Sequence, residues 1–254
     1  MPHGEVIPRA ASTTIFARDG AAKPEILLLK RGARANFMPN AHVFAGGAVD
    51  ESDESDEVSV LCRELDERRA CERLQLPSAG LRHFVAAVRE AFEECGLLLA
   101  RESGGEWVNL TAREDSELRE IRRQMSAGQS TLAALCRLRG WRLAVDELVF
   151  YSHWITPPGV PRRFDTRFFL CPVPSGQSAS LASDEMSELV WITAAEALAR
   201  RESGELMLMF PTRTLLREIA AFDDIDALFE FARRPRKITP YTPAVPPDFQ
   251  RINE

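Results

Sequence analysis

The sequence of 254 residues predicts an α/β fold in which strands and helices alternate around one sheet. Three observations support this prediction. Apolar or alternating runs typical of strands are interspersed with amphipathic segments typical of helices. The composition, 45% hydrophobic and 28% charged residues, is ordinary for a chain that buries a core. No stretch has the composition of a flexible linker, so we interpret residues 1–254 as a single domain with helical insertions.

Strands are expected to dominate the first fifty residues. Residues 11–17 and 25–30 read as two strands around a turn, and the second run is apolar enough to be covered on both faces. After a polar loop, residues 42–44 should form a strand that ends in a tight turn at Gly46-Gly47. The acidic run at residues 50–57 is interpreted as a solvated loop.

Helices are expected to follow. Residues 59–74 have apolar positions among many charged ones, and a break at residues 77–80 ends this pattern. Residues 81–95 form an amphipathic helix, with Gly96 placed to end it. Two shorter helices are expected beyond it, at residues 113–125 and 129–138. The chain thus carries one helical insertion at about residues 51–80 and further helical segments at about residues 113–138.

The rest of the chain repeats the alternation. Three strands are expected, at residues 147–155, 167–173 and 189–192. Thr193 should cap a helix that begins at Ala194, and Pro211 fits the first turn of a helix running through Ile219. The proline-rich tail from Pro235 onward is expected to be extended.

Charge and cysteine usage limit the classes of function. The formal net charge of −6 gives no indication of a nucleic-acid partner or an anionic membrane surface. Because the chain has no apolar stretch of membrane-spanning length and no signal peptide at its N-terminus, we expect a cytoplasmic protein. Five widely spaced cysteines fit free thiols, and four scattered histidines argue against a zinc site.

The expected helix at residues 81–95 carries three glutamates with a spacing that suggests metal binding. Glu90, Glu93 and Glu94 stand at i, i+3 and i+4, so their carboxylates share one face. Like charges so close together repel, and a hard divalent cation between the oxygens would relieve that repulsion. Mg²⁺ prefers such ligands, with Mn²⁺ as the alternative cation. The competing interpretation is an acidic surface helix.

The residues around these glutamates resemble a known motif. Residues 89–97, Arg-Glu-Ala-Phe-Glu-Glu-Cys-Gly-Leu, are similar to the second half of the Nudix box, Gly-x5-Glu-x7-Arg-Glu-U-x-Glu-Glu-x-Gly-U, where U is apolar. Phe44-Ala45-Gly46-Gly47 resembles the segment that enters the box. The resemblance implies a Nudix hydrolase with an α/β (α+β) fold, an α/β/α sandwich around a mixed sheet. Further similarity, at residues 27–32, 153–157 and 162–169, indicates the coenzyme A diphosphatase branch, the mammalian peroxisomal type numbered nineteen and its bacterial relatives.

The box departs from the family pattern in its length. Gly47 and Arg89 enclose 41 residues where the family has 13, an excess of 28. The first box glutamate falls on Asp53 when counted forward from Gly47, and on Leu81 when counted back from Arg89. The sequence leaves both counts open. We expect the inserted residues to flank the site and shape access to it.

The resemblance also implies roles for individual residues. Glu90 and Glu94 would be the main metal ligands, Glu93 would assist, and Gly46 would contribute its carbonyl oxygen. Glu93 and Glu94 are also expected to be catalytic, with Arg89 orienting a carboxylate. A fourth acidic group often completes such a site. Its candidates are Asp184, Glu185 and Glu188, of which we select Glu185.

Substrate recognition is expected to depend on arginine, whose planar group donates two hydrogen bonds to phosphate. The candidates are Arg31, Arg34, Arg163 and Arg167, with Arg162 also available. Trp154 and Phe164 could stack on adenine. The resemblance implies hydrolysis of coenzyme A or acyl-coenzyme A to adenosine 3′,5′-bisphosphate and a phosphopantetheine product. A pyrophosphatase for ADP-ribose or another nucleotide, a non-catalytic nucleotide-binding module, and a homodimer stay open.

Overall fold

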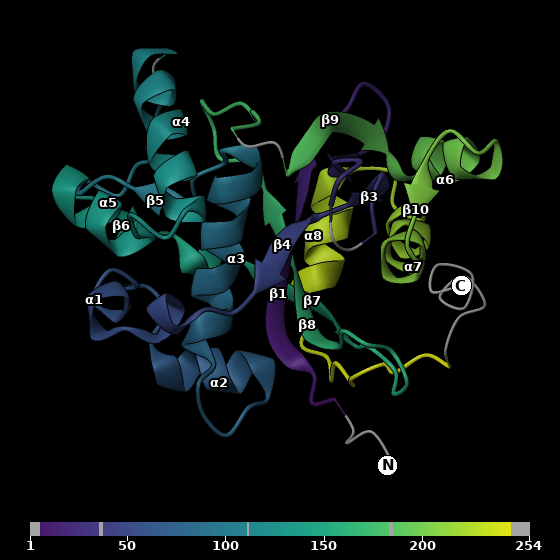
Figure 1. The fold of residues 1–254 in the computed structure, drawn as a ribbon, viewed down its shortest axis with the longest axis horizontal. Helices are drawn as coiled ribbons and strands as arrows, with labels where there is room; N and C mark the ends of the chain where they lie inside the picture. Colours follow the sequence, from purple (N-terminus) through teal and green to yellow (C-terminus); the bar gives the residue numbers. More distant parts are fainter. Residues whose placement is uncertain (1–5, 36–37, 111, 183–184, 245–254) are drawn as a thin grey trace.

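The computed structural model describes residues 6–35, 38–110, 112–182 and 185–244. Its centre is a sheet of eight strands with the order β10-β3-β2-β1-β8-β7, in which β4 also pairs with β1 and β9 with β2 (Figure 1). The strands are β1 (Arg9–Arg18), β2 (Glu25–Arg31), β3 (Ala41–Val43), β4 (Ala45–Ala48), β7 (Val149–Ile155), β8 (Phe164–Pro172), β9 (Met186–Thr193) and β10 (Met207–Leu208).

The sheet is mixed. β1 runs parallel to β8 and β10 parallel to β3, whereas the other pairs are antiparallel. The parallel pairing aligns Arg9 with Phe164 and continues without interruption to Ala17 and Pro172. This register brings the start of β1 next to the start of β8, although about 150 residues separate them in the chain.

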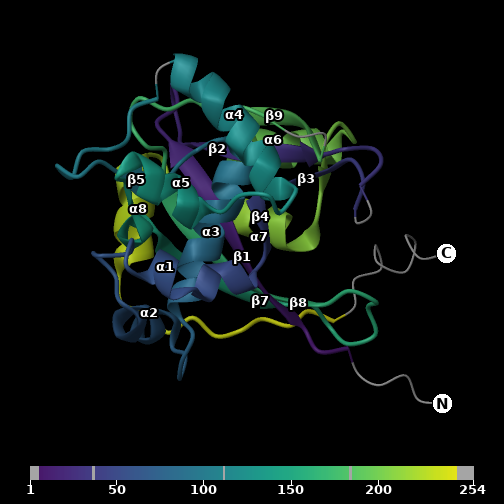
Figure 2. The same cartoon turned by 60° about the vertical axis from the view of Figure 1, so that its left-hand side comes forward.

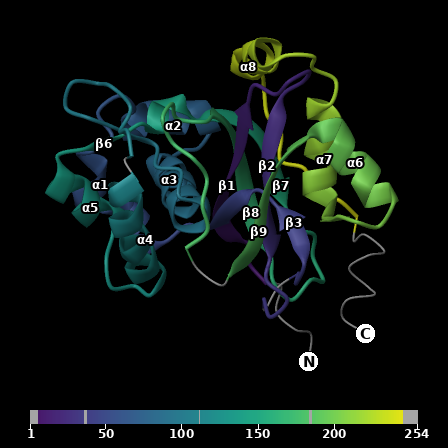
Figure 3. The same ribbon diagram turned by 90° about the horizontal axis from the view of Figure 1, so that it is seen from above.

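Helices cover both faces of the sheet, as Figure 3 shows. On one face lies α3, with α1, α2, α4 and α5 grouped around it (Figure 2). That side contains η1 (Glu51–Glu54), α1 (Asp56–Ser59), α2 (Glu67–Leu74), α3 (Leu81–Cys95), α4 (Ala112–Ser126), α5 (Leu132–Arg139), η2 (Val145–Glu147) and the small ribbon of β5 (Ala100–Arg101) and β6 (Arg142–Leu143). The opposite face carries α6 (Ala194–Glu202), α7 (Phe210–Ile219) and α8 (Ile225–Arg233). The expected α/β/α sandwich around a mixed sheet is confirmed.

Helix α3 is held against the sheet by its apolar face. Phe84, Val88 and Phe92 are fully buried, and the ring of Phe84 lies 4.7 Å from the ring of Phe169 on β8. Each such side chain contributes roughly 1.5–3 kcal/mol of burial free energy. The helix ends at Gly96, which has φ +73° and donates its N–H to the carbonyl of Phe92. Because packing of the apolar face fixes the rotation of α3 against the sheet, it also determines where the three glutamates lie.

Most elements agree with the sequence prediction. The expected strands correspond to β1, β2, β3, β7, β8 and β9, and the expected helices at residues 81–95, 113–125 and 129–138 correspond to α3, α4 and α5. Thr193 caps α6 by accepting the N–H of Glu196, and Pro211 lies in the first turn of α7. All five cysteines are free. No helix in the described part of the chain is long and apolar enough to span a bilayer.

Two local predictions were wrong. Gly46-Gly47 forms no tight turn, because both glycines pair with β1 as part of β4. The acidic run at residues 50–57 is not a solvated loop: Asp50 and Ser55 cap η1 and α1, and Asp53 is buried. Within residues 59–74, helix is found in α2 and at the last residue of α1. Helix α8 was not anticipated, and it is held by apolar residues buried against the sheet.

The C-terminal tail has no helix between residues 235 and 244 and passes the end of β7. Tyr241 forms a β-bridge with Trp154, donating its N–H to His153 and accepting the N–H of Ile155 at 2.9 Å each. Its ring packs edge-on against that of Trp154 at 4.8 Å. The tail thereby supports an aromatic side chain that lines the cavity described next.

Candidate active site

A cavity of about 530 Å³ opens between the C-terminal part of α3, strand β4 and the starts of β1 and β8. Its lining combines three kinds of side chain. The carboxylates are Glu90, Glu93, Glu94 and Glu185; the cations are Arg9, Arg31 and Arg162; and the aromatic rings are Phe44, Trp154, Phe164, Phe168 and Phe210. A cavity lined by acidic, basic and aromatic side chains can bind a phosphate ester that also has apolar parts.

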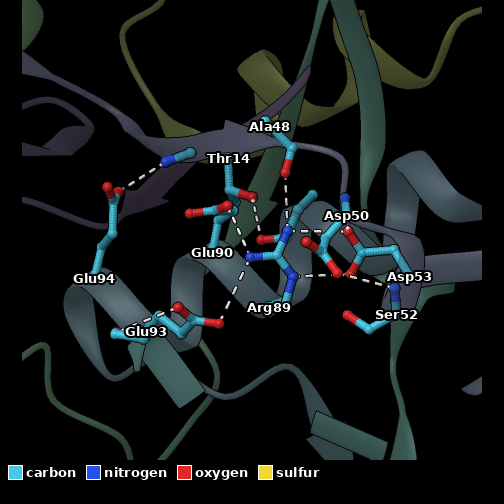
Figure 4. Close-up of polar contacts among 12 residues, drawn as sticks. Thr14, Ala48, Asp50, Ser52, Asp53, Arg89, Glu90, Glu93 and Glu94 are labelled. Atoms are coloured by element: carbon cyan, nitrogen blue, oxygen red, sulfur yellow. Dashed lines mark hydrogen bonds and ion pairs between the residues drawn. The ribbon is translucent and has the colours of Figure 1, made fainter. Parts of the chain in front are cut away.

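The three glutamates of α3 face the cavity with different partners (Figure 4). Glu94 is 8% exposed and accepts the backbone N–H of Gly46 at 2.8 Å. Glu90 accepts a hydrogen bond from Arg89 at 2.8 Å. Glu93 accepts the hydroxyl of Ser126 at 3.3 Å and lies 3.6 Å from the Arg89 guanidinium. About one turn of α3 thus places all three carboxylates on the same wall of the cavity.

Burial makes these carboxylates difficult to ionise without a cation. It raises the pKa of Glu94 well above the ordinary value, and the charge of Glu90 adds to the effect against the opposing Gly46 N–H. Burial also raises the pKa of Glu90 to about 7 despite the neighbouring Arg89, and raises the pKa of Glu93. A divalent cation would stabilise the ionised forms, so the chemistry of this donor set fits Mg²⁺.

The carboxylates do not converge in the conformation observed. Among the residues that the structure describes, no three Asp, Glu, His or Cys side chains gather closely enough to hold a metal ion. Two of the glutamates instead accept hydrogen bonds from the protein: Glu90 from the Arg89 side chain and Glu94 from the backbone N–H of Gly46. Gly46 thus contacts Glu94 through its N–H, and the role of its carbonyl oxygen as a metal ligand stays a prediction.

Arg89 lies behind the glutamates and anchors them to the inserted segment. Its guanidinium donates two hydrogen bonds of 2.9 Å to Asp53, one of 2.9 Å to the carbonyl of Ala48 and one to Glu90. Burial alone would lower the pKa of Arg89, but the hydrogen bond to Asp53 and the charges of Glu90 and Asp53 outweigh it and raise that pKa. Arg89 is therefore a fixed cation that orients Glu90.

Asp53 stands six places after Gly47, and its side chain is only 2% exposed. Besides pairing with Arg89, it accepts the N–H of Asp50 at 2.8 Å as part of a capping box. Leu81, the other possible match to the first box glutamate, begins α3 and is buried with the core. The geometry favours the count from Gly47 and puts the extra residues after Asp53. None of residues 51–80, all of which the structure describes, lines the cavity, and their expected role in substrate access stays a prediction.

The two glycines of β4 are required for different reasons. A Cβ on Gly46 would lie 2.5 Å from the carbonyl oxygen of Ser12 and 2.6 Å from the Cα of Thr13, both backbone atoms of β1. A Cβ on Gly47 would lie 2.5–2.7 Å from three atoms of the Glu90 carboxyl group. The missing side chain of Gly46 leaves room for the backbone of β1, whereas that of Gly47 leaves room for the Glu90 carboxylate.

Substituting each glycine with alanine should separate these effects. We expect Gly46→Ala to lower the free energy of unfolding by about 1–3 kcal/mol, because the backbone of β1 must move. Gly47→Ala should cost less, because the Glu90 side chain can rotate away. Urea unfolding of both variants measures the difference. Equal losses would show that the Glu90 carboxylate is as rigidly placed as the strand.

The predicted phosphate-binding arginines are only partly brought together. Arg31 lines the cavity and lies 3.4 Å from Glu185. Arg34 is exposed and outside the lining that the described residues define. Arg163 is buried and donates to the carbonyls of Thr156 and Val6, and Arg167 is buried beside Asp165, so neither faces the cavity. Arg162, Trp154 and Phe164 do line it.

The candidates for the fourth acidic group differ in their position relative to the cavity. Glu185 lines the cavity beside Arg31. Glu188 lies outside the lining and forms an exposed ion pair of 3.6 Å with Lys30. Asp184 falls outside the residues that the structure describes. Sequence reasoning missed several lining residues, among them the polar Arg9 and Ser126. Parallel pairing of β1 with β8 places Arg9, and the packing of α4 on α3 places Ser126, and no local pattern signals either contact.

Comparisons with known proteins identify the family of this chain. The chain matches the family model of the NUDT19 Nudix domain over two overlapping segments, residues 6–79 and 66–218. It is 30% identical over 237 residues to acyl-coenzyme A diphosphatase NUDT19 of Xenopus laevis, covering 82% of this chain and 62% of that protein. To the protein of the same name in Gallus gallus it is 30% identical over 250 residues, covering 84% and 65%. The chain thus spans less than two thirds of these relatives.

A solved structure extends the likeness to three dimensions. The crystal structure of a Nudix hydrolase from Alicyclobacillus acidocaldarius superposes with a TM-score of 0.69 at 28% sequence identity, covering 89% of this chain and 96% of that one. The family match covers well over half of the sequence and includes β4 and α3 with its three glutamates. The chain belongs to the NUDT19 Nudix domain family of Nudix hydrolases.

Proposed function

We propose that this protein is a Mg²⁺-dependent diphosphatase that hydrolyses coenzyme A or acyl-coenzyme A to adenosine 3′,5′-bisphosphate and a phosphopantetheine product. The observation that carries the proposal is one cavity in which the α3 glutamates face arginines and aromatic rings. The relatives named acyl-coenzyme A diphosphatase support the same substrate class. Mn²⁺ would suit the same carboxylates.

The glutamates of α3 would hold the cation. Glu90 and Glu94 are assigned as the main ligands and Glu93 as an assisting one, while Arg89 keeps Glu90 oriented. When bound, the metal supplies positive charge that neutralises the diphosphate oxygens and activates water. Gly46, whose N–H holds Glu94, keeps this carboxylate at the cavity wall.

Glu185 is assigned as the proton acceptor, with Arg31 holding its carboxylate. A water oxygen attacks one phosphorus, and the bond from that phosphorus to the bridging oxygen breaks. The bridging oxygen leaves with the other phosphate, and the proton of the water passes to Glu185. Glu185 is exposed and lines the cavity, so water can reach it.

The remaining arginines and rings would bind the ends of the substrate. Arg9 and Arg162 lie near the paired starts of β1 and β8, and Phe164 lies directly in register with Arg9. The neighbouring ring of Trp154 is fixed between Phe210 at 5.6 Å and Tyr241 at 4.8 Å. A nucleotide base beside a phosphate monoester matches this combination of rings and cations.

A panel of diphosphate substrates tests the proposal. With Mg²⁺ present, we expect coenzyme A and acyl-coenzyme A to have a higher kcat/KM than ADP-ribose or a dinucleotide. A clear preference for ADP-ribose would favour a different Nudix pyrophosphatase. Tight nucleotide binding without turnover of any substrate would favour a non-catalytic module.

The 3′-phosphate of coenzyme A provides a finer prediction. Coenzyme A should exceed dephospho-coenzyme A in kcat/KM by about tenfold or more, since a charge-assisted hydrogen bond contributes about 1.5–3 kcal/mol. Arg162→Glu should reduce this ratio, because Arg162 lines the cavity. Arg34→Glu, on an exposed arginine outside the lining, is the matched control. An unchanged ratio in Arg162→Glu would remove Arg162 from phosphate recognition.

A further inference from the structure

We propose that α4, which lies outside the Nudix box, is a positioning helix for the active site, acting on Glu93 through Ser126 and Arg122. The inference rests on the proposed function, because Glu93 is assigned there as an assisting metal ligand. Helix α4 belongs to the helical segments at residues 112–139, and its last residue, Ser126, reaches the cavity. Arg122 stands one turn earlier.

Arg122 binds the backbone of the catalytic helix. Its guanidinium donates to the carbonyl of Glu93 from Nε at 3.3 Å and from Nη2 at 3.2 Å. This carbonyl lies in the last turn of α3, where carbonyls have no partner within the helix. A cation here also interacts favourably with the helix dipole. Arg122 is 1% exposed, which fixes the guanidinium in place.

Ser126 binds the side chain of the same residue. Its hydroxyl donates to one carboxylate oxygen of Glu93 at 3.3 Å, while the other oxygen lies 3.6 Å from Arg89. The pair Arg122 and Ser126 therefore holds Glu93 at both its backbone and its carboxylate. Because Ser126 itself is exposed, its hydroxyl contributes little to the core and can act mainly on Glu93.

Arg122 also joins α3 to the segment that leads to Glu185. It donates to the carbonyl of Ser180 at 2.7 Å and to the hydroxyl of Ser180 at 3.1 Å. The N–H of Ser180 in turn binds the carbonyl of Cys95 at 2.8 Å. Glu185 follows five residues later in the sequence. One buried guanidinium thus connects the helix end that carries Glu93 with Ser180.

The glycine of the motif takes part in this arrangement. A Cβ on Gly96 would lie 2.7 Å from Nη1 of Arg122 and 2.9 Å from the hydroxyl of Ser180. Gly96 is needed for its φ of +73° and also because Arg122 and Ser180 close over it. The end of α3 is therefore shaped to receive α4.

Direct metal binding tests the proposal. Isothermal titration of the full chain with Mn²⁺ should show that Ser126→Ala raises the Kd about three- to tenfold, the effect of one lost hydrogen bond. Ser126→Thr, which keeps the hydroxyl, should restore the Kd. Ser203→Ala, at the end of α6 on the opposite face, is the matched control and should bind as the wild type does.

Measurements of the Tm and of coenzyme A turnover distinguish loss of positioning from loss of folding and from failure of the proposed function. Ser126→Ala should leave the Tm unchanged, whereas Arg122→Gln is expected to lower it, so the conclusion depends on the Ser126 variants. A wild-type Kd in Ser126→Ala, or a wild type that binds no Mn²⁺, would overturn the positioning role. Failure of the proposed function would appear separately, as an absence of coenzyme A turnover by the wild type while the Kd values still differ.

Discussion

Replacing Glu94 with glutamine is expected to lower kcat by more than tenfold while the protein stays folded. Glu94 is buried, lines the cavity and accepts the N–H of Gly46. An amide of the same size can still accept that hydrogen bond, so the packing of α3 on β4 should persist. The negative charge is lost, however, and with it the interaction that the proposed cation needs.

The measurement is kcat with coenzyme A, with the Tm as a check on folding. Glu188→Gln removes a similar charge on β9 outside the cavity lining and should keep wild-type turnover. If Glu94→Gln retained more than about a tenth of the wild-type rate, the change in barrier would be less than about 1.4 kcal/mol. Glu94 would then not be a principal metal ligand.

Replacing Arg89 with methionine is expected to lower the free energy of unfolding by about 3–5 kcal/mol, because it leaves buried carboxylates without their partner. Arg89 is 12% exposed and Asp53 only 2%, and two hydrogen bonds of 2.9 Å join them. Glu90 and the carbonyl of Ala48 would lose donors as well.

Urea unfolding measures this loss. The matched control is Arg18→Met, whose ion pair with Glu25 is 44% and 27% exposed. An exposed pair of this kind contributes only about 0–1 kcal/mol. If both substitutions cost the same, Arg89 would not be the anchor between the inserted segment and the catalytic helix. Its role in orienting Glu90 would then need another explanation.

The catalytic helix could be predicted because its signals are local. The apolar periodicity of residues 81–95 defines the face of α3 that packs on the sheet, and Gly96 supplies the left-handed conformation that ends it. The spacing of the glutamates then determines which carboxylates share the opposite face. Nothing outside the segment is needed for these predictions.

Gly46-Gly47 shows where local reasoning fails. Two glycines favour a turn, but pairing with β1 and the Glu90 carboxylate places them in a strand. Asp53 shows the same limit. Counting residues could not decide between Asp53 and Leu81, because the choice depends on which side chain meets Arg89 after the inserted segment has folded back.

The arginines illustrate a second limit. Arg162, Arg163 and Arg167 belong to one short segment, yet only Arg162 lines the cavity, because burial and strand alternation direct the other two elsewhere. Arg9 lies far away in sequence and reaches the cavity through the parallel pairing of β1 with β8. Residue type suggested the chemistry, but only tertiary pairing selects the residues.

The central claim is tested most directly by the products formed from coenzyme A. The wild type should be incubated with coenzyme A and Mg²⁺, with and without EDTA, and the products identified by mass spectrometry. We predict adenosine 3′,5′-bisphosphate and phosphopantetheine in equal amounts with Mg²⁺, and neither with EDTA. Intact coenzyme A under both conditions, with ADP-ribose cleaved by the same preparation, would contradict the proposed substrate.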